Sequence, residues 1–151
     1  MEDEFAQLNE VVQLIIQRPG MEKISFEAKL FDLRNGMCRL TIAWPVGGVE
    51  RDFDADDFYE CLRAFRRVIE PEGFRVLCQG ARPNVRPSGM SSQMGGAWKS
   101  YIHTLGEPAM MKDLVETFAP VEDIESVGTV EEQDEFIRLH WEAFKKRTYS
   151  P

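Results

Sequence analysis

The sequence predicts an α+β fold in a single domain over residues 1–151, with a mostly antiparallel sheet of about five to six strands and three helices packed on it. Residues 23–31 alternate between polar and apolar side chains, which predicts a strand with one exposed face. Asn35-Gly36 follows and favours a tight hairpin, which an all-parallel sheet does not contain. Neither a repeat nor a low-complexity linker indicates a second domain.

The first predicted element is a helix over residues 3–17. Acidic residues occupy its first turn, where the helix dipole favours negative charge, and Pro19-Gly20 ends it. Its apolar residues recur at helical spacing: Phe5, Leu8, Val12, Ile15 and Ile16.

A hairpin and a second helix come next. The strand at 23–31 is expected to pair with a strand at 37–44, and residues 49–53 can add a short third strand. Asp54 is predicted to cap a helix that runs to Ile69, with Asp57 at the third position of a capping box. The apolar stripe of this helix consists of Phe58, Leu62, Phe65 and Ile69.

The second half of the chain is predicted to hold three strands, a glycine-rich loop and a final helix. Strands are expected at 74–78, at 98–105 and within 114–121, and the strand at 98–105 should be central because both of its faces are partly apolar. The loop at 80–96 can contain a single helical turn from Ser88. Thr129 and Glu132 form a capping box that begins the last helix. The predicted buried side of that helix comprises Val130, Phe136, Ile137, His140, Trp141 and Phe144.

Composition excludes several classes of protein. An apolar fraction of 43% with ten Phe excludes a disordered chain, and a pI near 4.8 argues against nucleic acid as the main partner. The three cysteines are odd in number and form no CxxC pair, so buried free thiols and a reducing cytoplasm are expected. The acidic N-terminus does not resemble a signal peptide, and the apolar runs are too short to span a membrane.

Charge is segregated along the chain. Residues 73–106 contain no Asp or Glu, whereas residues 107–135 contain ten acidic residues against the single Lys112. That acidic stretch can be an ordinary solvated surface, or it can steer a basic partner. The residues expected to bind such a partner are Glu116, Glu122, Asp123 and Glu125, with Trp98 or Tyr101 as an aromatic anchor.

The glycine-rich loop is the other candidate site. The stretch from Gly89 to Ser100 superficially resembles a phosphate-binding loop, but Trp98 stands where that motif needs glycine, and a strand rather than a helix is expected afterwards. The loop can still hold an anion or a carboxylate through its backbone and its arginines. The residues expected to take part are Arg82, Arg86, Ser88, Gly89 and His103.

No catalytic, metal-binding or cofactor motif stands out in the sequence. Two histidines are too few for a His-rich metal site, and His140 is expected to be a hydrogen-bonded structural residue. No G-x-S-x-G elbow accompanies the serines near His103. The acidic residues at 50–57 lack the glycine of a calcium loop, and helix capping explains them better.

One segment resembles known proteins. Arg86-Pro-Ser-Gly-Met-Ser-Ser-Gln-Met-Gly-Gly, Trp98-Lys-Ser-Tyr101 and Gly128-Thr-Val-Glu-Glu-Gln133 resemble a group of small bacterial proteins that includes immunity proteins of polymorphic toxin systems of the Rhs and contact-dependent inhibition kinds. The resemblance covers the C-terminal half of the chain. It implies a cytoplasmic protein that blocks a cognate toxin by stoichiometric binding, and it carries over no catalytic residue.

The sequence therefore favours a non-enzymatic binding protein, most concretely an acidic immunity protein that occludes a basic toxin without a cofactor. The alternative is a small-ligand or nucleotide-related domain, possibly enzymatic, that uses the 80–96 loop with Arg82, Arg86 and His103. A third reading, an oligomerising scaffold, requires an exposed apolar face on the first predicted helix. These alternatives differ in whether the functional surface is acidic, concave or apolar.

Overall fold

The computed structural model describes residues 6–45 and 47–149, and it has an α+β fold. A five-stranded antiparallel sheet has the strand order β4-β3-β2-β1-β5, and a separate three-stranded sheet has the order β6-β7-β8. The main elements are β1 (Gln7–Gln17), β2 (Ile24–Asp32), β3 (Cys38–Ala43), β4 (Glu50–Ala55), α1 (Phe58–Ile69), β5 (Arg75–Val76), β6 (Val85–Arg86), α2 (Gly89–Gly95), β7 (Lys99–Ile102), β8 (Leu114–Glu116) and α3 (Val130–Tyr149).

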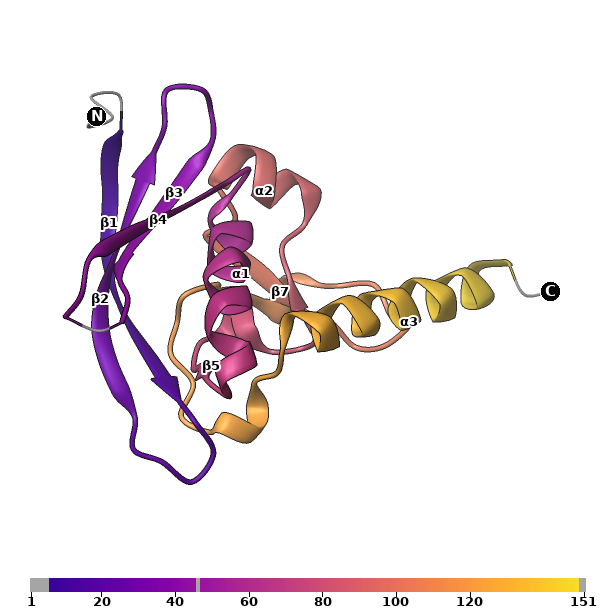
Figure 1. The fold of residues 1–151 in the computed structure, drawn as a ribbon. Helices are drawn as coiled ribbons and strands as arrows, with labels where there is room; N and C mark the ends of the chain where they lie inside the picture. Colours follow the sequence, from indigo (N-terminus) through magenta and orange to yellow (C-terminus); the bar gives the residue numbers. More distant parts are fainter. Residues whose placement is uncertain (1–5, 46, 150–151) are drawn as a thin grey trace.

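The larger sheet curves around α1, and the smaller sheet lies on the other side of that helix (Figure 1). Helix α3 starts beside α1 and then extends away from the larger sheet. The core lies between the sheet and α1, where Leu14, Leu30, Leu40 and Phe65 are almost inaccessible to solvent. Burial of such side chains is the main stabilising contribution to a fold of this size.

The predicted N-terminal helix is wrong, because residues 7–17 form β1, the longest strand. Residues 3–5 of that prediction lie outside the described residues. Leu14 and Ile16 point into the core and Ile15 points away from it. Side chains therefore alternate between the two faces, as in a strand, although the apolar residues of this segment also fit helical spacing. Antiparallel pairing with β2 from Gln7↔Asp32 to Ile16↔Ile24 stabilises the strand, and helical spacing in the sequence alone cannot reveal this long-range pairing.

The predicted hairpin is confirmed. β2 and β3 pair antiparallel, and Gly36 adopts φ +84°, a left-handed conformation that glycine reaches without strain. Phe26, Ala28 and Leu30 face the core on β2, and Cys38, Leu40 and Ile42 do so on β3. The alternation in the sequence therefore identified the correct faces.

Helix α1 occupies the predicted place but begins three residues later. The N-cap is Asp57, whose side chain accepts a hydrogen bond from the Glu60 N–H at 2.7 Å. The capping position assigned to Asp54 was wrong, because β4 continues through Ala55 and Asp54 pairs with Arg39 across the sheet. The predicted apolar stripe of α1 is fully buried.

The second sheet is smaller than the sequence indicates. β7 is central, as predicted, but it pairs with the short strands β6 and β8 and forms a separate sheet. The strands predicted at 74–78 and 114–121 shorten to Arg75–Val76 and Leu114–Glu116, and a single bridge from Cys78 to Pro120 links the regions that follow them. The turn predicted at Ser88 is the helix α2, with Ser88 as its N-cap.

Helix α3 begins at the predicted capping box. The Thr129 hydroxyl accepts from the Glu132 N–H, and the Glu132 carboxylate accepts from the Thr129 N–H, both at 3.1 Å. The fully buried Arg66 of α1 anchors the start of α3, because its guanidinium binds Glu70, Gln133 Oε1 and the Gly128 carbonyl at 2.6–2.8 Å. The three cysteines are buried and free, as predicted.

Candidate functional site

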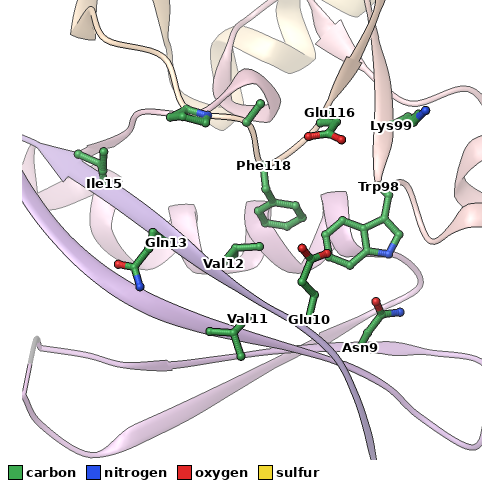
Figure 2. Close-up of a pocket in the computed structure, with 12 residues that line it drawn as sticks. Asn9, Glu10, Val11, Val12, Gln13, Ile15, Trp98, Lys99, Glu116 and Phe118 are labelled. Atoms are coloured by element: carbon green, nitrogen blue, oxygen red, sulfur yellow. The ribbon is translucent and has the colours of Figure 1, made fainter.

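A groove runs along β1 and separates it from the segment around β8 (Figure 2). Its volume is about 560 Å³. Side chains of β1 form one wall, and side chains of residues 98–120 face them from the other wall. We call this hollow the β1 groove, and it is lined by Asn9, Glu10, Val11, Val12, Gln13, Ile15, Trp98, Lys99, Glu116, Phe118, Ala119 and Pro120.

The edge of β1 that borders this groove is largely unpaired. β5 covers only the end of that edge, through the pairs Ile16↔Val76 and Gln17↔Arg75 and the hydrogen bond from the Leu77 N–H to the Ile15 carbonyl at 2.8 Å. In an antiparallel strand the N–H and C=O of one residue point to the same side, and successive residues alternate. The backbone groups of Val11 and Gln13 therefore point, like those of Ile15, to the open edge.

Aromatic rings form the wall opposite β1. Trp98 is half-buried and contacts Phe118 with ring centroids 5.6 Å apart. Its other neighbour is Phe58 of α1, at 4.8 Å. These contacts hold the indole at the rim of the β1 groove.

The β1 groove is acidic. Two carboxylates, those of Glu10 and Glu116, line it together with one cation, Lys99. Neither carboxylate has an ion-pair partner within residues 6–45 and 47–149. A second hollow of about 710 Å³ shares Asn9 and Trp98 with the β1 groove and adds the exposed carboxylates of Asp32 and Asp56. The combined surface therefore carries more negative than positive charge.

The remaining residues of the acidic stretch are used in several places. Asp113 and Asp123 accept hydrogen bonds from backbone N–H groups at the starts of short helical turns. Asp134 pairs with Arg63, and Glu135 pairs with Arg138 at 2.6 Å. The stretch at 107–135 thus supplies local caps and ion pairs as well as exposed carboxylates.

Among the predicted partner-binding residues, Trp98 and Glu116 come together in the β1 groove. Glu122, Asp123 and Glu125 are exposed beyond β8, and the Glu122 carbonyl accepts from Lys23 Nζ at 2.9 Å, next to the β1–β2 turn. Tyr101 lies elsewhere, in the cavity described next.

A third hollow lies between α3 and the strands β6 and β7. It has a volume of about 790 Å³, and we call it the α3 cavity. It contains four of the five residues predicted for the glycine-rich loop, namely Arg86, Ser88, Gly89 and His103. Arg82 is not among its lining residues, because its guanidinium turns to Gln79 Oε1 at 3.0 Å.

The two histidines meet at this cavity. Their rings lie 5.0 Å apart, and His140 Nδ1 accepts a hydrogen bond from the Gly106 N–H at 3.0 Å, which confirms the predicted structural role of His140. Burial lowers the pKa of both histidines below the ordinary value of 6.5, and the neighbouring His140 lowers that of His103 further. Both rings are therefore neutral at physiological pH.

The cysteines offer no reactive thiol. Burial raises the pKa of Cys38 and of Cys78 to about 11, and it raises the pKa of Cys61 as well. Thiols with such pKa values are protonated and poorly nucleophilic at neutral pH. Their role is to pack in the core.

The described part of the chain has neither a metal-ligand cluster nor a membrane-spanning helix. No three His, Cys, Asp or Glu side chains converge there into a set that could hold a metal ion. None of the helices there combines the length and apolar composition needed to cross a bilayer.

Comparison of the chain with protein-family models and with curated proteins finds no match. The resemblance to immunity proteins therefore stays a prediction.

Sequence reasoning missed the β1 groove because it assigned residues 3–17 to a helix. The signal that could have revealed it is the run Val11-Val12 and Ile15-Ile16, since β-branched residues favour strands. It also missed Phe118 and the role of α3 as a cavity wall. The sequence predicts Ile137, His140, Trp141 and Phe144 on the buried side of this helix, but all four line the cavity and the Trp141 side chain is 53% exposed.

Proposed function

We propose that this chain is a non-enzymatic binding protein of the immunity type, which neutralises a basic toxin by holding an extended segment of it in the β1 groove. The observation that carries the proposal is the open edge of β1 beside an acidic, aromatic wall. A strand edge with free N–H and C=O groups is a template for another chain, and many peptide-binding proteins use it in this way.

The geometry suits an extended segment. Residues 9–15 of β1 border the groove, which corresponds to a strand length of roughly 20 Å. Main-chain hydrogen bonds to Val11 and Gln13 would supply affinity without regard to sequence. Successive side chains of the bound segment would point alternately toward the rings of Trp98 and Phe118 (Figure 2) and toward the solvent.

Charge determines the kind of segment. Glu10, Glu116, Asp32 and Asp56 surround the groove and its extension, so Lys or Arg on the bound segment would find carboxylates at either end. A second copy of this chain is a poorer occupant. Two β1 edges placed side by side would bring two sets of these carboxylates together, and like charges across a strand pair are destabilising.

A peptide titration tests the docking mode. The probe is a short capped peptide of alternating Lys and Val, and its control has Glu in place of Lys. We expect the Lys peptide to shift the amide NMR signals of Val11 and Gln13 and to bind more weakly as salt is added, because salt screens the carboxylates. Equal binding of the Glu peptide, or shifts confined to other strands, would contradict the charge argument.

A proline variant tests the use of the strand edge. Gln13→Pro removes the outward N–H and leaves the pairing with β2 intact, whereas Gln13→Ala removes the same side chain but keeps the donor. We expect the proline variant to lose binding of the Lys peptide and the alanine variant to retain it. Both should remain folded by circular dichroism.

The toxin assignment needs its own test. If the protein is an immunity protein, the adjacent gene should encode a protein with a basic toxic domain that forms a one-to-one complex with this chain. Co-expression should protect cells from that domain, and Gln13→Pro should not protect them. A stable dimer of this chain through β1 in sedimentation analysis would instead favour self-association.

A further inference from the structure

The α3 cavity has a different chemistry from the β1 groove, and it does not enter the proposed function. One wall is the middle of α3, where Ile137, His140, Trp141 and Phe144 recur at helical spacing. The opposite wall is the pair β6–β7. Arg86 is paired with Tyr101 across these strands, His103 follows directly after β7, and all three residues line the cavity.

Two residues that line this cavity each have a polar atom without a hydrogen-bond partner. Arg86 Nη1 and His103 Nδ1 are both inaccessible to solvent, and no described residue bonds to either. Buried polar groups in folded proteins are almost always paired, because an unpaired one loses its hydration without compensation. Neither atom touches the open space, but the fold leaves both side chains short of polar partners where they border the cavity.

The charge of Arg86 favours an anion at this end of the cavity. Arg86 carries a permanent positive charge, and no carboxylate within residues 6–45 and 47–149 forms an ion pair with it. Both histidines are neutral, so the cavity offers a single positive charge. One guanidinium beside a neutral imidazole matches a singly charged carboxylate better than a phosphate dianion.

The rest of the cavity is apolar and aromatic. Trp141 contacts Phe144 with ring centroids 5.8 Å apart and contacts His140 at 5.3 Å, yet more than half of its surface remains exposed. On the far side, Gly106 turns the chain against α3 with φ +75°, and an added Cβ there would lie 3.1 Å from Ala143 Cβ. The chain closes tightly at Gly106 and leaves Trp141 uncovered.

We infer that the α3 cavity binds a small aromatic carboxylate, with its carboxylate beside the Arg86 guanidinium and its ring against Trp141 and Phe144. The bound acid neutralises the charge of Arg86. Its ring covers apolar surface that the fold leaves open. A pocket of this size, mostly apolar with a few converging polar groups, has the usual form of a small-molecule site.

The test uses phenylacetate and indole-3-acetate as probes, with phenylacetamide and acetate as controls. We expect the two aromatic acids to raise the melting temperature in a saturable manner, because a ligand that binds only the folded state stabilises it. The neutral amide should bind about tenfold or more weakly, since it lacks the charged hydrogen bond. Equal binding of acid and amide, or no binding of either acid, overturns the inference.

Matched variants place the site. Arg86→Gln should weaken phenylacetate binding about tenfold or more, and Arg82→Gln, which changes a neighbouring half-buried arginine outside the cavity, should not. Trp141→Ala provides a second variant that should fold normally, because this side chain is exposed, and it should weaken the aromatic acids but not acetate. Unchanged affinity in both Arg86→Gln and Trp141→Ala overturns the assignment.

A peptide arm separates two sources of the same chemistry. A short peptide that ends in Phe with a free carboxylate presents the same groups as phenylacetate, and its C-terminal amide does not. Binding of phenylacetate supports a small-molecule site. Binding of the free-acid peptide alone, with no binding of phenylacetate, overturns it in favour of a protein terminus.

Discussion

The β1 groove and the α3 cavity share no lining residue, and they are built from different parts of the chain. The groove owes its form to a backbone edge that no strand covers, and carboxylates surround it. The cavity owes its form to the side chains of one helical stripe, and its only charged lining residue is Arg86. A backbone edge selects an extended chain with little regard to sequence, whereas a cavity lined by aromatic side chains with one fixed charge selects a small molecule.

The β1 groove and the α3 cavity also differ in the contacts that hold their walls in place. β1 is paired with β2 along nearly its whole length, whereas the end of α3 that lines the cavity extends away from the core. The start of α3 is anchored by the buried network of Arg66, Glu70 and Gln133, and its middle is held by the hydrogen bond from Gly106 to His140. Changes in this network should therefore affect the cavity more than the groove.

The largest expected effect comes from Arg66→Met. It leaves the Glu70 carboxylate buried without its guanidinium, and breaking a buried ion pair from one side costs about 3–5 kcal/mol of unfolding free energy. Urea unfolding measures the loss. Hydrogen exchange should show faster opening of α3 than of β1.

A second change provides the control for that prediction. In the Arg66→Met, Glu70→Met double variant no charge is left unpaired, so it should recover part of the stability that the single variant loses. If the single variant unfolds as readily as the wild type, the network does not anchor α3.

The next effect concerns the charge of the groove. The double variant Glu10→Lys, Glu116→Lys should weaken binding of the Lys–Val peptide roughly tenfold, because each exposed ion pair contributes only modestly to the binding free energy. Glu131→Lys changes an exposed carboxylate on α3 outside the groove and is the matched control. Phenylacetate binding in the α3 cavity should not change in either variant, and a parallel loss would show that the two sites are coupled.

A smaller effect should appear as pH dependence at the cavity. The pKa values of His103 and His140 are lowered in the folded chain, so below about pH 6.5 the unfolded chain binds more protons than the folded one. The unfolding free energy should therefore fall as pH decreases from about 7.5 to about 5.5, and His103→Gln should reduce that fall. Urea unfolding at both pH values measures the unfolding free energy of each protein. An equal fall in the wild type and in His103→Gln would contradict the assignment of this pH dependence to His103.

The smallest expected effect is on the stability of Arg86→Met without ligand. Arg66 and Arg86 are both arginines with buried nitrogens, but Arg86 Nη1 has no partner to lose. Its replacement should leave the unfolding free energy within about 1 kcal/mol of the wild type. A loss as large as that of Arg66→Met would mean that Arg86 is a structural residue.

Several local elements could be predicted from the sequence because neighbouring residues specify them. Asn35-Gly36 requires a positive φ, the alternation at 23–31 identifies the buried face of β2, and Thr129 with Glu132 satisfies the first N–H groups of α3. Four of the five residues of the predicted loop set, Arg86, Ser88, Gly89 and His103, also come together in one cavity, and Arg82 does not. In each case the relevant partners lie close in sequence or on adjacent strands.

The errors have the opposite origin. Leu8, Val12, Ile15 and Ile16 fit a helical spacing, but β1 is a strand because β2 supplies its hydrogen bonds and the core receives Leu14 and Ile16. Trp141 fits the apolar stripe of α3, yet its side chain is 53% exposed. Periodicity states that a face is apolar, and it does not state what will cover that face.

By itself the sequence determined the hairpin, the position of α1, the start of α3, the burial of the three cysteines and the segregation of charge. Only the tertiary structure decided that β1 is a strand with an open edge, that Trp98 and Glu116 face that edge, and that Arg86 and His103 face Trp141 across a cavity. The physical reason is distance along the chain. Caps and turns are fixed by contacts within a few residues, whereas strand edges and cavities are defined by which distant segments do not meet.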